Sequence, residues 1–522
     1  MTASDERSSV IPGWARGPRG RALVCVAAVI VGLIVVNSVV RGPGPKGAGG
    51  HFVPAPSLPA VQVGKASAWR CPGPLPVGGG RENSRISILN SGPKAVSAVV
   101  KVSRVRPPRG GTSSGATTST FVTEVPAGSQ ALLSLAKRGS AGFAAVSVDA
   151  DGSGIAVAES ITNVSTAHDS TGGGLSVLSS PCSLGAATHG YLPVGSTLDG
   201  SDVKVSLYNP DVTPAVVDLS VSTGTGETSP PAFQGVAVPA TGLVVLDLRR
   251  WEPQRSALAL TATAVTGDVV LGALESTSEV VAIPAGSKVA TRSARIRFAG
   301  SSLLVGPSRG FAKWSFLARQ SSGGMNSTYV VFNPGDRPVL VSVAPPGQSE
   351  KTAAITAEVP AGGIVEVATP VIVGGKIPVG SVVVSARWNA PIVVARVTTR
   401  LRTRHLEELQ ATAGTGRPCD EWLLPGAQVA PWTGDVALLA NPGDGPATVT
   451  LSEFRPGALA PTRVEVVTLG AGVEIEVSLG PAGKPGRLFA VQVSATAPVL
   501  AEQQEMAVQG MITTVGGIPV IG

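Results

Sequence analysis

The chain has 522 residues and a net charge of +7, and only 14% of its residues are charged. A chain with 43% hydrophobic residues is too apolar to be disordered, and so small a charge over this length does not favour a nucleic-acid-binding protein. Its 65 glycines and 43 prolines, beside only 4% aromatic residues, predict many short strands joined by tight turns.

The first element in chain order is an apolar segment at residues 22–40, ALVCVAAVIVGLIVVNSVV, which contains no charged residue. As a helix it is long enough to cross the hydrocarbon core of a membrane. More arginines precede it than follow it, which predicts a cytoplasmic tail at 1–21 and an exported remainder. A cleavable signal peptide is the alternative, but its apolar core is usually shorter and ends at a small-residue cleavage site that this segment lacks. Residues 41–60, rich in Gly and Pro, predict a spacer.

Four similar segments follow the spacer, each centred on an asparagine that ends an apolar run and begins a turn. We call these residues the marker asparagines; they are Asn90, Asn209, Asn333 and Asn441. Two residues before each of them, and six, eight and ten residues after it, the side chain is apolar. A spacing of two is the period of a strand with one buried face, and Asn, Pro and Gly are typical turn residues.

The marker asparagines lie 119, 124 and 108 residues apart, and each interval holds about seven strand-like runs. This spacing predicts an all-β protein of four tandem immunoglobulin-like β-sandwich repeats after one N-terminal transmembrane helix. A β-propeller is the alternative, but its blades are usually only about 40 to 50 residues long. The predicted repeats are 61–184, 185–300, 301–414 and 415–522.

Three of the four cysteines lie beyond the apolar segment. Cys71 just precedes the first repeat and Cys182 just follows it, so a disulfide between them is geometrically reasonable, and an exported location permits it. Cys419 is then unpaired; a Cys182–Cys419 bridge is the alternative if the repeats fold back on one another.

The sequence offers no catalytic, cofactor-binding or metal-binding motif that we would assign. The cysteines form no CxxC pair, and the four histidines are scattered. Glu159, Glu275 and Glu502 recur at corresponding places near the last strand of repeats one, two and four, where repeat three has Arg396. We expect the three glutamates to lie on a solvated strand face. Six tryptophans are predicted to lie in the core or at domain junctions: Trp69, Trp251, Trp314, Trp388, Trp422 and Trp432.

An arginine row is the one candidate contact for an anionic partner. In an extended strand Arg400, Arg402 and Arg404 would lie on one side, where they could meet phosphate or carboxylate polymers. A charged edge strand that blocks aggregation is the simpler interpretation.

The Ala/Gly/Val/Arg-rich composition, the Arg-flanked apolar segment and the Asn-Pro-Gly-type repeats together resemble an uncharacterised family of actinobacterial membrane-anchored, exported β-rich proteins, a domain-of-unknown-function family. The resemblance extends over residues 20–522. It implies a cell-envelope setting and no particular enzyme activity.

We therefore expect a single-pass cell-membrane protein with a cytoplasmic N-terminus and an extracytoplasmic bulk. Its expected role is non-catalytic, as a cell-envelope scaffold or protein-binding module without a cofactor. The expected partners are the membrane, through the N-terminal helix, and an envelope protein, with an anionic wall polymer as a further candidate and no nucleic acid. The alternative is an extracytoplasmic enzyme that acts on cell-wall material through a site not visible in the sequence.

Overall fold

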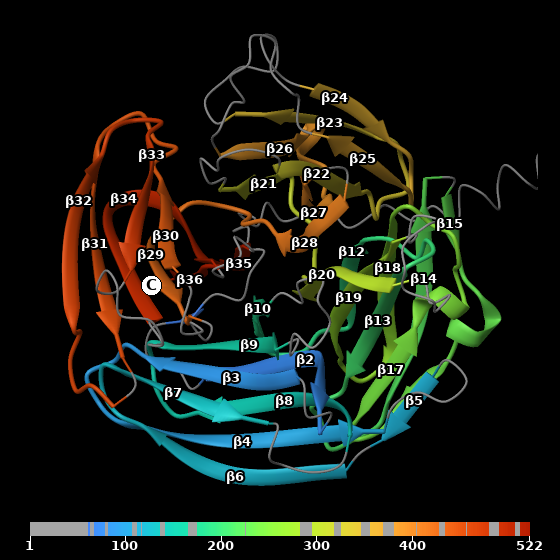
Figure 1. The fold of residues 1–522 in the computed structure, drawn as a ribbon, viewed down its shortest axis with the longest axis horizontal. Helices are drawn as coiled ribbons and strands as arrows, with labels where there is room; N and C mark the ends of the chain where they lie inside the picture. The colour runs from blue at the N-terminus through green and yellow to red at the C-terminus, as the bar shows by residue number, and fades with distance from the viewer. Residues whose placement is uncertain are drawn as a thin grey trace, which may run out of the picture. The chain divides into compact units, whose positions relative to one another are not determined.

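The fold is known from a computed structural model, and the regular elements it describes are β-strands and three short 3-10 turns (Figure 1). The described residues are 61–62, 67–78, 82–106, 112–115, 117–135, 141–164, 175–224, 226–281, 295–317, 325–345, 355–368, 381–402, 405–426, 434–455, 457–479, 490–506 and 512–521. The protein is therefore all-β, as predicted. The predicted tail, anchor and spacer (1–21, 22–40 and 41–60) lie outside the described residues. Within the described ranges, no helix is long and apolar enough to span a membrane.

The first group of strands forms two antiparallel sheets, which we call sheet pair 1. One sheet has the order β10-β9-β3-β7 and the other β11-β2-β8-β4-β6. The strands are β2 (Ser67–Val77), β3 (Glu82–Asn90), β4 (Val96–Val105), β6 (Thr117–Val125), β7 (Ser129–Ser134), β8 (Gly142–Ala150), β9 (Ile155–Val164), β10 (Leu175–Pro181) and β11 (Ser183–Leu184). In Figure 1, β4, β6 and β8 lie side by side, as their pairing requires.

Sheet pair 2 repeats this arrangement with the orders β12-β18-β14-β15, where β16 also pairs with β14, and β20-β19-β13-β17-β5. Its elements are β5 (Thr112–Gly115), β12 (His189–Val194), β13 (Ser201–Tyr208), β14 (Ala215–Thr223), β15 (Gly226–Thr228), η2 (Pro231–Phe233), β16 (Val236–Val238), β17 (Leu243–Asp247), η3 (Leu248–Arg250), β18 (Leu258–Thr266), β19 (Val270–Val281) and β20 (Arg295–Val305). The short strand β5 comes from the first predicted repeat but pairs with β17. The predicted boundary between residues 300 and 301 lies within β20; the domain limits themselves stay predictions.

Sheet pair 3 consists of two four-stranded sheets, β21-β26-β23-β24 and β25-β22-β27-β28. Its elements are β21 (Lys313–Phe316), β22 (Met325–Phe332), β23 (Val339–Ala344), β24 (Ile355–Val359), β25 (Ile364–Ala368), β26 (Val382–Ala386), η4 (Arg387–Asn389), β27 (Val393–Arg402) and β28 (His405–Ala413).

In sheet pair 4 the two layers join into one nine-stranded sheet, β1-β36-β29-β34-β30-β33, with β31, β32 and β35 attached to its side. The strands are β1 (Val61–Gln62), β29 (Cys419–Leu424), β30 (Gly434–Ala440), β31 (Ala447–Phe454), β32 (Arg463–Leu469), β33 (Glu474–Leu479), β34 (Ala490–Met506), β35 (Ile512–Gly516) and β36 (Ile518–Ile521). The long strand β34 joins them, because its first half pairs with β29 and β31 and its second half with β30 and β35.

The marker asparagines explain why each sheet pair is built alike. The Asn90 side-chain oxygen accepts the backbone N–H of Gly92 at 3.0 Å, which closes an Asx turn. Its Nδ2 donates to the carbonyls of Lys94, Val125 and Pro126. Each of the other three marker asparagines makes the same four kinds of bond. One buried amide therefore ties together two turns at the same end of each sheet pair.

The four apolar cores come from alternating side chains, as in β14, where every second residue from Ala215 is buried. Neighbouring sheet pairs also contribute to one another's cores: Phe454 of β31 belongs to the core of sheet pair 1, and Ala395 of β27 to that of sheet pair 2. Four strands, one from each sheet pair, make the innermost contacts: β10 and β28 each contact both β20 and β35.

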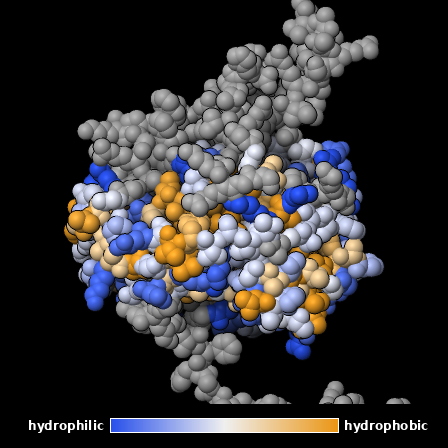
Figure 2. All heavy atoms as spheres, turned by 90° about the horizontal axis from the view of Figure 1, so that it is seen from below, coloured by the Kyte–Doolittle hydropathy of each residue, from blue (hydrophilic) through white to orange (hydrophobic). Residues whose placement is uncertain are grey.

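Two strands pair with a neighbour along one edge only, and their exposed faces carry both polar and apolar residues. In the described part of the chain, β6 pairs only with β4, and β32 only with β31. The exposed residues of β6 are polar except for Val122, whereas β32 exposes Val464 and Val466. Figure 2 shows one face of the molecule, where hydrophobic residues lie in small groups among hydrophilic ones.

Candidate functional site: a buried disulfide and a recurring carboxylate

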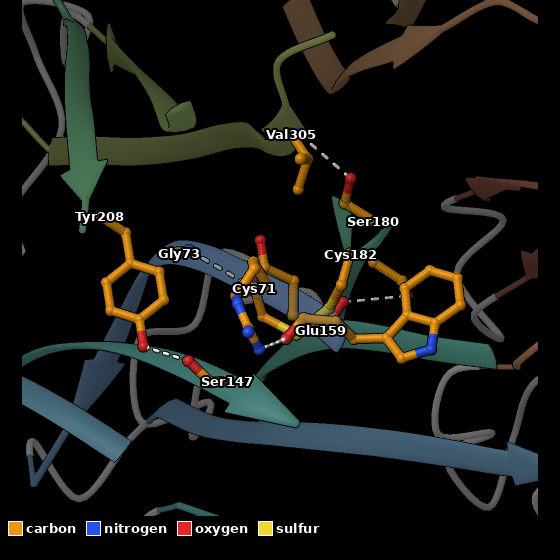
Figure 3. Close-up of a disulfide and its surroundings, with 11 residues drawn as sticks. Cys71, Gly73, Ser147, Glu159, Ser180, Cys182, Tyr208 and Val305 are labelled. Carbon is orange, nitrogen blue, oxygen red and sulfur yellow. Dashed lines mark hydrogen bonds between the residues drawn. A yellow bond between two sulfur atoms is a disulfide. The ribbon is translucent and has the colours of Figure 1, made fainter. Parts of the chain in front are cut away.

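The most distinctive side-chain cluster of sheet pair 1 surrounds a disulfide (Figure 3). Cys71 of β2 is bonded to Cys182, which lies between β10 and β11, and neither is exposed. This is the pair that the sequence indicated. Cys419 of β29 is buried as a free thiol, and burial raises its pKa. Two of the three cysteines beyond the apolar segment are therefore joined across the first repeat.

Glu159 of β9 is fully buried beside this disulfide. Its Oε2 accepts the backbone N–H of Gly73 at 3.0 Å, as Figure 3 shows. Its Oε1 has no hydrogen-bond partner in the described part of the chain. Burial raises the pKa of this carboxyl to about 8, against the lowering effect of the Gly73 hydrogen bond. Glu159 is therefore mostly a neutral acid at neutral pH.

Gly73 is the residue that brings a backbone donor so close to Glu159. Its φ is +67°, and a Cβ there would lie 2.3 Å from the backbone nitrogen of Leu75 and 2.4 Å from the carbonyl oxygen of Ala144. Only glycine fits such a position.

The same cluster contains three groups that could bind a metal ion. The two sulfurs and a carboxylate oxygen of Glu159 lie within 4.8 Å of one another. Thiolates with a carboxylate are ligands that zinc accepts. In the disulfide, however, the sulfurs carry no thiolate charge, so these three residues do not fit a metal ion in the state that the structure shows.

The second recurring glutamate has the same kind of partner. Glu275 of β19 is 3% exposed, and its Oε1 accepts the backbone N–H of Ser196 at 2.9 Å. Burial raises its pKa to about 7, and hydrogen bonds from Ser196 and Gly195 lower it in part. A Cβ on Gly195 would lie 2.2 Å from that oxygen, so this glycine admits the carboxyl as Gly73 admits Glu159.

The third recurring glutamate, Glu502 of β34, has a different partner. Its Oε1 accepts the backbone N–H of Leu317 at 3.1 Å, and its Oε2 lies 3.4 Å from Nη2 of Arg396 on β27. Arg396 also donates to the Leu317 carbonyl. Burial raises the pKa of Glu502, and Arg396 lowers it in part. A buried ion pair thus joins sheet pairs 3 and 4 at the position where sheet pairs 1 and 2 each hold a lone acid.

The prediction that the three glutamates lie on a solvated strand face was wrong. Glu159, Glu275, Arg396 and Glu502 are each at most 4% exposed. The physical reason is that neighbouring segments cover the second face of these strands too; β2, for example, contacts both β9 and β19. A charged residue at the same place in all four repeats was the signal for a specific bond rather than for solvent. The three glutamates accept hydrogen bonds from backbone N–H groups, and Glu502 also forms an ion pair with Arg396.

The arginine row is only partly described. Arg400 and Arg402 lie in β27, where they pair in register with Glu408 and His405 of β28. Arg404 lies outside the described residues. Contact with an anionic partner therefore stays a prediction.

The tryptophans divide into two groups. Trp69, Trp314 and Trp422 are fully buried in the cores of sheet pairs 1, 3 and 4, as predicted. Trp388 is 84% exposed, so its predicted core or junction position was wrong. Trp251 is 37% exposed and packs against Phe233 of η2. Trp432 lies outside the described residues.

Sequence reasoning also missed a polar cluster in sheet pair 4. Asp435 of β30 is 5% exposed and accepts a hydrogen bond from Nε2 of Gln503 at 2.7 Å. Burial raises its pKa well above the usual range, and the charge of Glu453 on β31 adds to this. Glu453 in turn pairs with Arg463 at 2.9 Å. A carboxylate at the start of the apolar run of β30 was the available signal.

Fold and cluster together define an all-β protein with a disulfide-linked first sheet pair. The Family of unknown function (DUF5719) matches residues 134–400, just over half of the chain. The chain belongs to this family. No curated protein matches the chain. The crystal structure of Thermotoga maritima 1070 is similar at 15% sequence identity, over 20% of this chain and 95% of that one, with a TM-score of 0.18. A likeness this low carries no argument about fold or function.

Proposed function

We propose that this protein is a non-catalytic, membrane-anchored extracytoplasmic protein that acts as a cell-envelope scaffold or protein-binding module. The observation that carries the proposal is the disulfide between Cys71 and Cys182, because disulfides persist mainly in oxidising compartments outside the cytoplasm. The charge asymmetry around residues 22–40 supports the same orientation, with the N-terminus inside and the bulk outside.

The buried charged groups support a structural rather than a catalytic role for the recurring positions. Glu159 and Glu275 each bind a backbone N–H, and Glu502 binds a backbone N–H and Arg396. A catalytic carboxyl must reach a substrate, whereas these side chains are sealed from solvent. Their bonds fix segments of backbone.

The proposal includes the domain architecture of the chain. We interpret the four sheet pairs as tandem immunoglobulin-like sandwiches that follow a single transmembrane helix and a Gly/Pro-rich spacer at 41–60. The equivalent amide bonds of the marker asparagines support four equivalent units. Tandem sandwiches on a tether extend binding surfaces away from a membrane, which suits a scaffold.

The test is chemical crosslinking in the native membrane followed by mass spectrometry of what is joined to residues 61–522. Recovery of one defined envelope protein, in the same stoichiometry from independent preparations, is the expected result. Finding no partner, while the purified protein turns over a cell-wall precursor, would favour the alternative of an extracytoplasmic enzyme. An alkaline phosphatase fused after Gly522 checks the topology separately and should be active.

A further inference from the structure

The turn η4, Arg387–Asn389, presents the most exposed tryptophan of the described residues. Trp388 is 84% exposed. Its backbone is left-handed, with φ 55° and ψ 25°, and Asn389 beside it also has φ 55°. Asparagine tolerates this conformation, whereas a bulky aromatic residue rarely adopts it. Trp388 thus combines an unfavourable backbone with an unburied ring.

The other sheet pairs show that the fold does not need this arrangement. The turn η4 lies in the connection that leads from one sheet of the pair to the other, between β26 and β27. The matching connection between β8 and β9 contains Gly154 at φ +75°, and that between β18 and β19 contains Gly267 at φ +74°. In sheet pair 4 the strand β34 runs on without a connection. Only sheet pair 3 places a tryptophan where glycine would be unstrained.

Exposed basic residues lie in this turn and on the strands beside it. Arg387 is exposed in the same turn. Lys313 is exposed on β21, where it pairs with Ser385 of β26 just before the turn. Arg337 is exposed directly before β23, the strand that contacts η4, beside the acidic Asp336. These three basic residues outnumber the two exposed acids of the same region, Asp336 and Glu358, which pairs with Leu340 of β23, so the neighbourhood of Trp388 carries a net positive charge.

We propose that Trp388 is an anchor residue through which this protein binds a partner protein, with the indole inserted into an apolar pocket rimmed by carboxylates. This inference rests on the proposed function and names the binding surface it requires. Tryptophan and arginine are the residue types that most often dominate protein interfaces, and strained backbone is retained where function needs it. A lone protruding ring suits a concave pocket, whereas sugar platforms are broader aromatic surfaces. The nearby rings of Phe311 and Trp314 pack edge to face in the core.

Site-specific photo-crosslinking in living cells tests this proposal on the full chain. The crosslinking amino acid replaces Ser385, which is half-buried and next to the turn, so Trp388 itself stays in place. We expect an adduct with one defined protein. In a Trp388→Gly background its yield should fall at least about tenfold, since the anchor is removed. The matched control is Asn389→Gly, which relaxes the neighbouring left-handed residue and keeps the ring; its yield should stay unchanged.

The stability of the same variants excludes a merely structural role. Glycine is unstrained at this φ, so Trp388→Gly should melt at the same temperature as the wild type or higher. The protein identified in the adduct, once purified, should bind the wild-type chain at least about tenfold more tightly than Trp388→Gly. An unchanged adduct yield, unchanged affinity, or a variant that melts lower would overturn the proposal.

A second crosslinking position separates this inference from the proposed function. Val212 is exposed in a turn of sheet pair 2, away from η4 in the sequence. A protein adduct from Val212 with none from Ser385 would overturn the role of Trp388 and leave the scaffold function standing. Adducts from Ser385 to lipid or glycan alone would overturn the assignment of the partner as a protein, and no protein adduct from either position would contradict both.

Discussion

Sheet pairs 1 and 2 and sheet pairs 3 and 4 hold the same recurring position in two different ways. In the first two, Glu159 and Glu275 are lone buried acids, each bonded to a backbone N–H. In the last two, Arg396 occupies the position in sheet pair 3 and pairs with Glu502 of sheet pair 4. One arrangement stays within a sheet pair, while the other joins two of them.

A repeated fold can therefore accommodate a buried charged residue in two ways. A lone carboxyl avoids the cost of desolvation by staying protonated, which ties its stability to pH. An ion pair keeps both charges but depends on both partners, so the loss of either one leaves an uncompensated charge. Changes at Glu159, Glu275 and Arg396 should separate the two arrangements, and changes at the marker asparagines should affect the sheet pairs alike.

The largest effect is expected for Glu159 at alkaline pH. Its native pKa of about 8 lies above the unfolded value of 4.5, so the native state keeps a proton that the unfolded state loses. The stabilisation is complete below about pH 4.5 and is lost as the pH rises through 8. Between pH 5 and pH 9 the loss of stability is on the order of 4 kcal/mol. Glu159→Gln should remove this part of the decrease in the free energy of unfolding with pH. Urea unfolding of variant and wild type at pH 5 and pH 9 would show it. Equal pH slopes for variant and wild type would refute a neutral Glu159.

Breaking the Arg396–Glu502 ion pair should reduce the free energy of unfolding by nearly as much. Arg396→Met leaves the buried charge of Glu502 without its partner and should reduce the free energy of unfolding by about 3 to 4 kcal/mol at pH 7. The double variant Arg396→Met with Glu502→Leu removes both charges and should recover most of that loss. Denaturant titration of the single and double variants measures both. A double variant no more stable than Arg396→Met would contradict the coupling.

A smaller pH effect is expected for Glu275. Its native pKa of about 7 is closer to the unfolded value, so the stability lost between pH 5 and pH 9 is about 3 kcal/mol. Glu275→Gln should therefore flatten the pH profile of the unfolding free energy less than Glu159→Gln does, because the part that it removes ends near pH 7 rather than near pH 8. Differential scanning fluorimetry across this range compares the two variants directly. The reverse order would contradict the assignment.

The smallest effect is expected at the marker asparagines, where the four sheet pairs agree. Asn333→Ala removes bonds to the carbonyls of Arg337, Val359 and Pro360 and should cost about 1 to 3 kcal/mol. Asn441→Ala removes the equivalent bonds and should cost a similar amount. Thermal unfolding of both variants checks this. Strongly unequal losses would show that the units are not equivalent.

The sequence predicted the features that depend on local chemistry. The period-two runs and the turns after the marker asparagines predicted an all-β chain with recurring units, and the cysteines on either side of the first repeat indicated the disulfide. It did not predict that β34 would run from one layer into the other, because that depends on pairing with four different strands.

The candidate site was less predictable for a related reason. Alternation within a strand indicates which residues share a face, but not whether neighbouring segments cover both faces. Glu159 was therefore assigned to solvent, although β2 lies against it. The sequence predicts a core or domain-junction position for Trp388; only comparison with Gly154 and Gly267 in the matching connections shows that it departs from the pattern.

Both the proposed scaffold function and the Trp388 anchor require that the β-rich part folds outside the cytoplasm. Counting free thiols in protein taken directly from cells, denatured and tagged with a bulky maleimide, tests this most directly. Of the four cysteines, Cys25 and Cys419 should accept tags without reductant and all four after reduction. A Cys71→Ser control should show Cys182 as a third free thiol. Four tags on the unreduced wild-type chain would contradict the account.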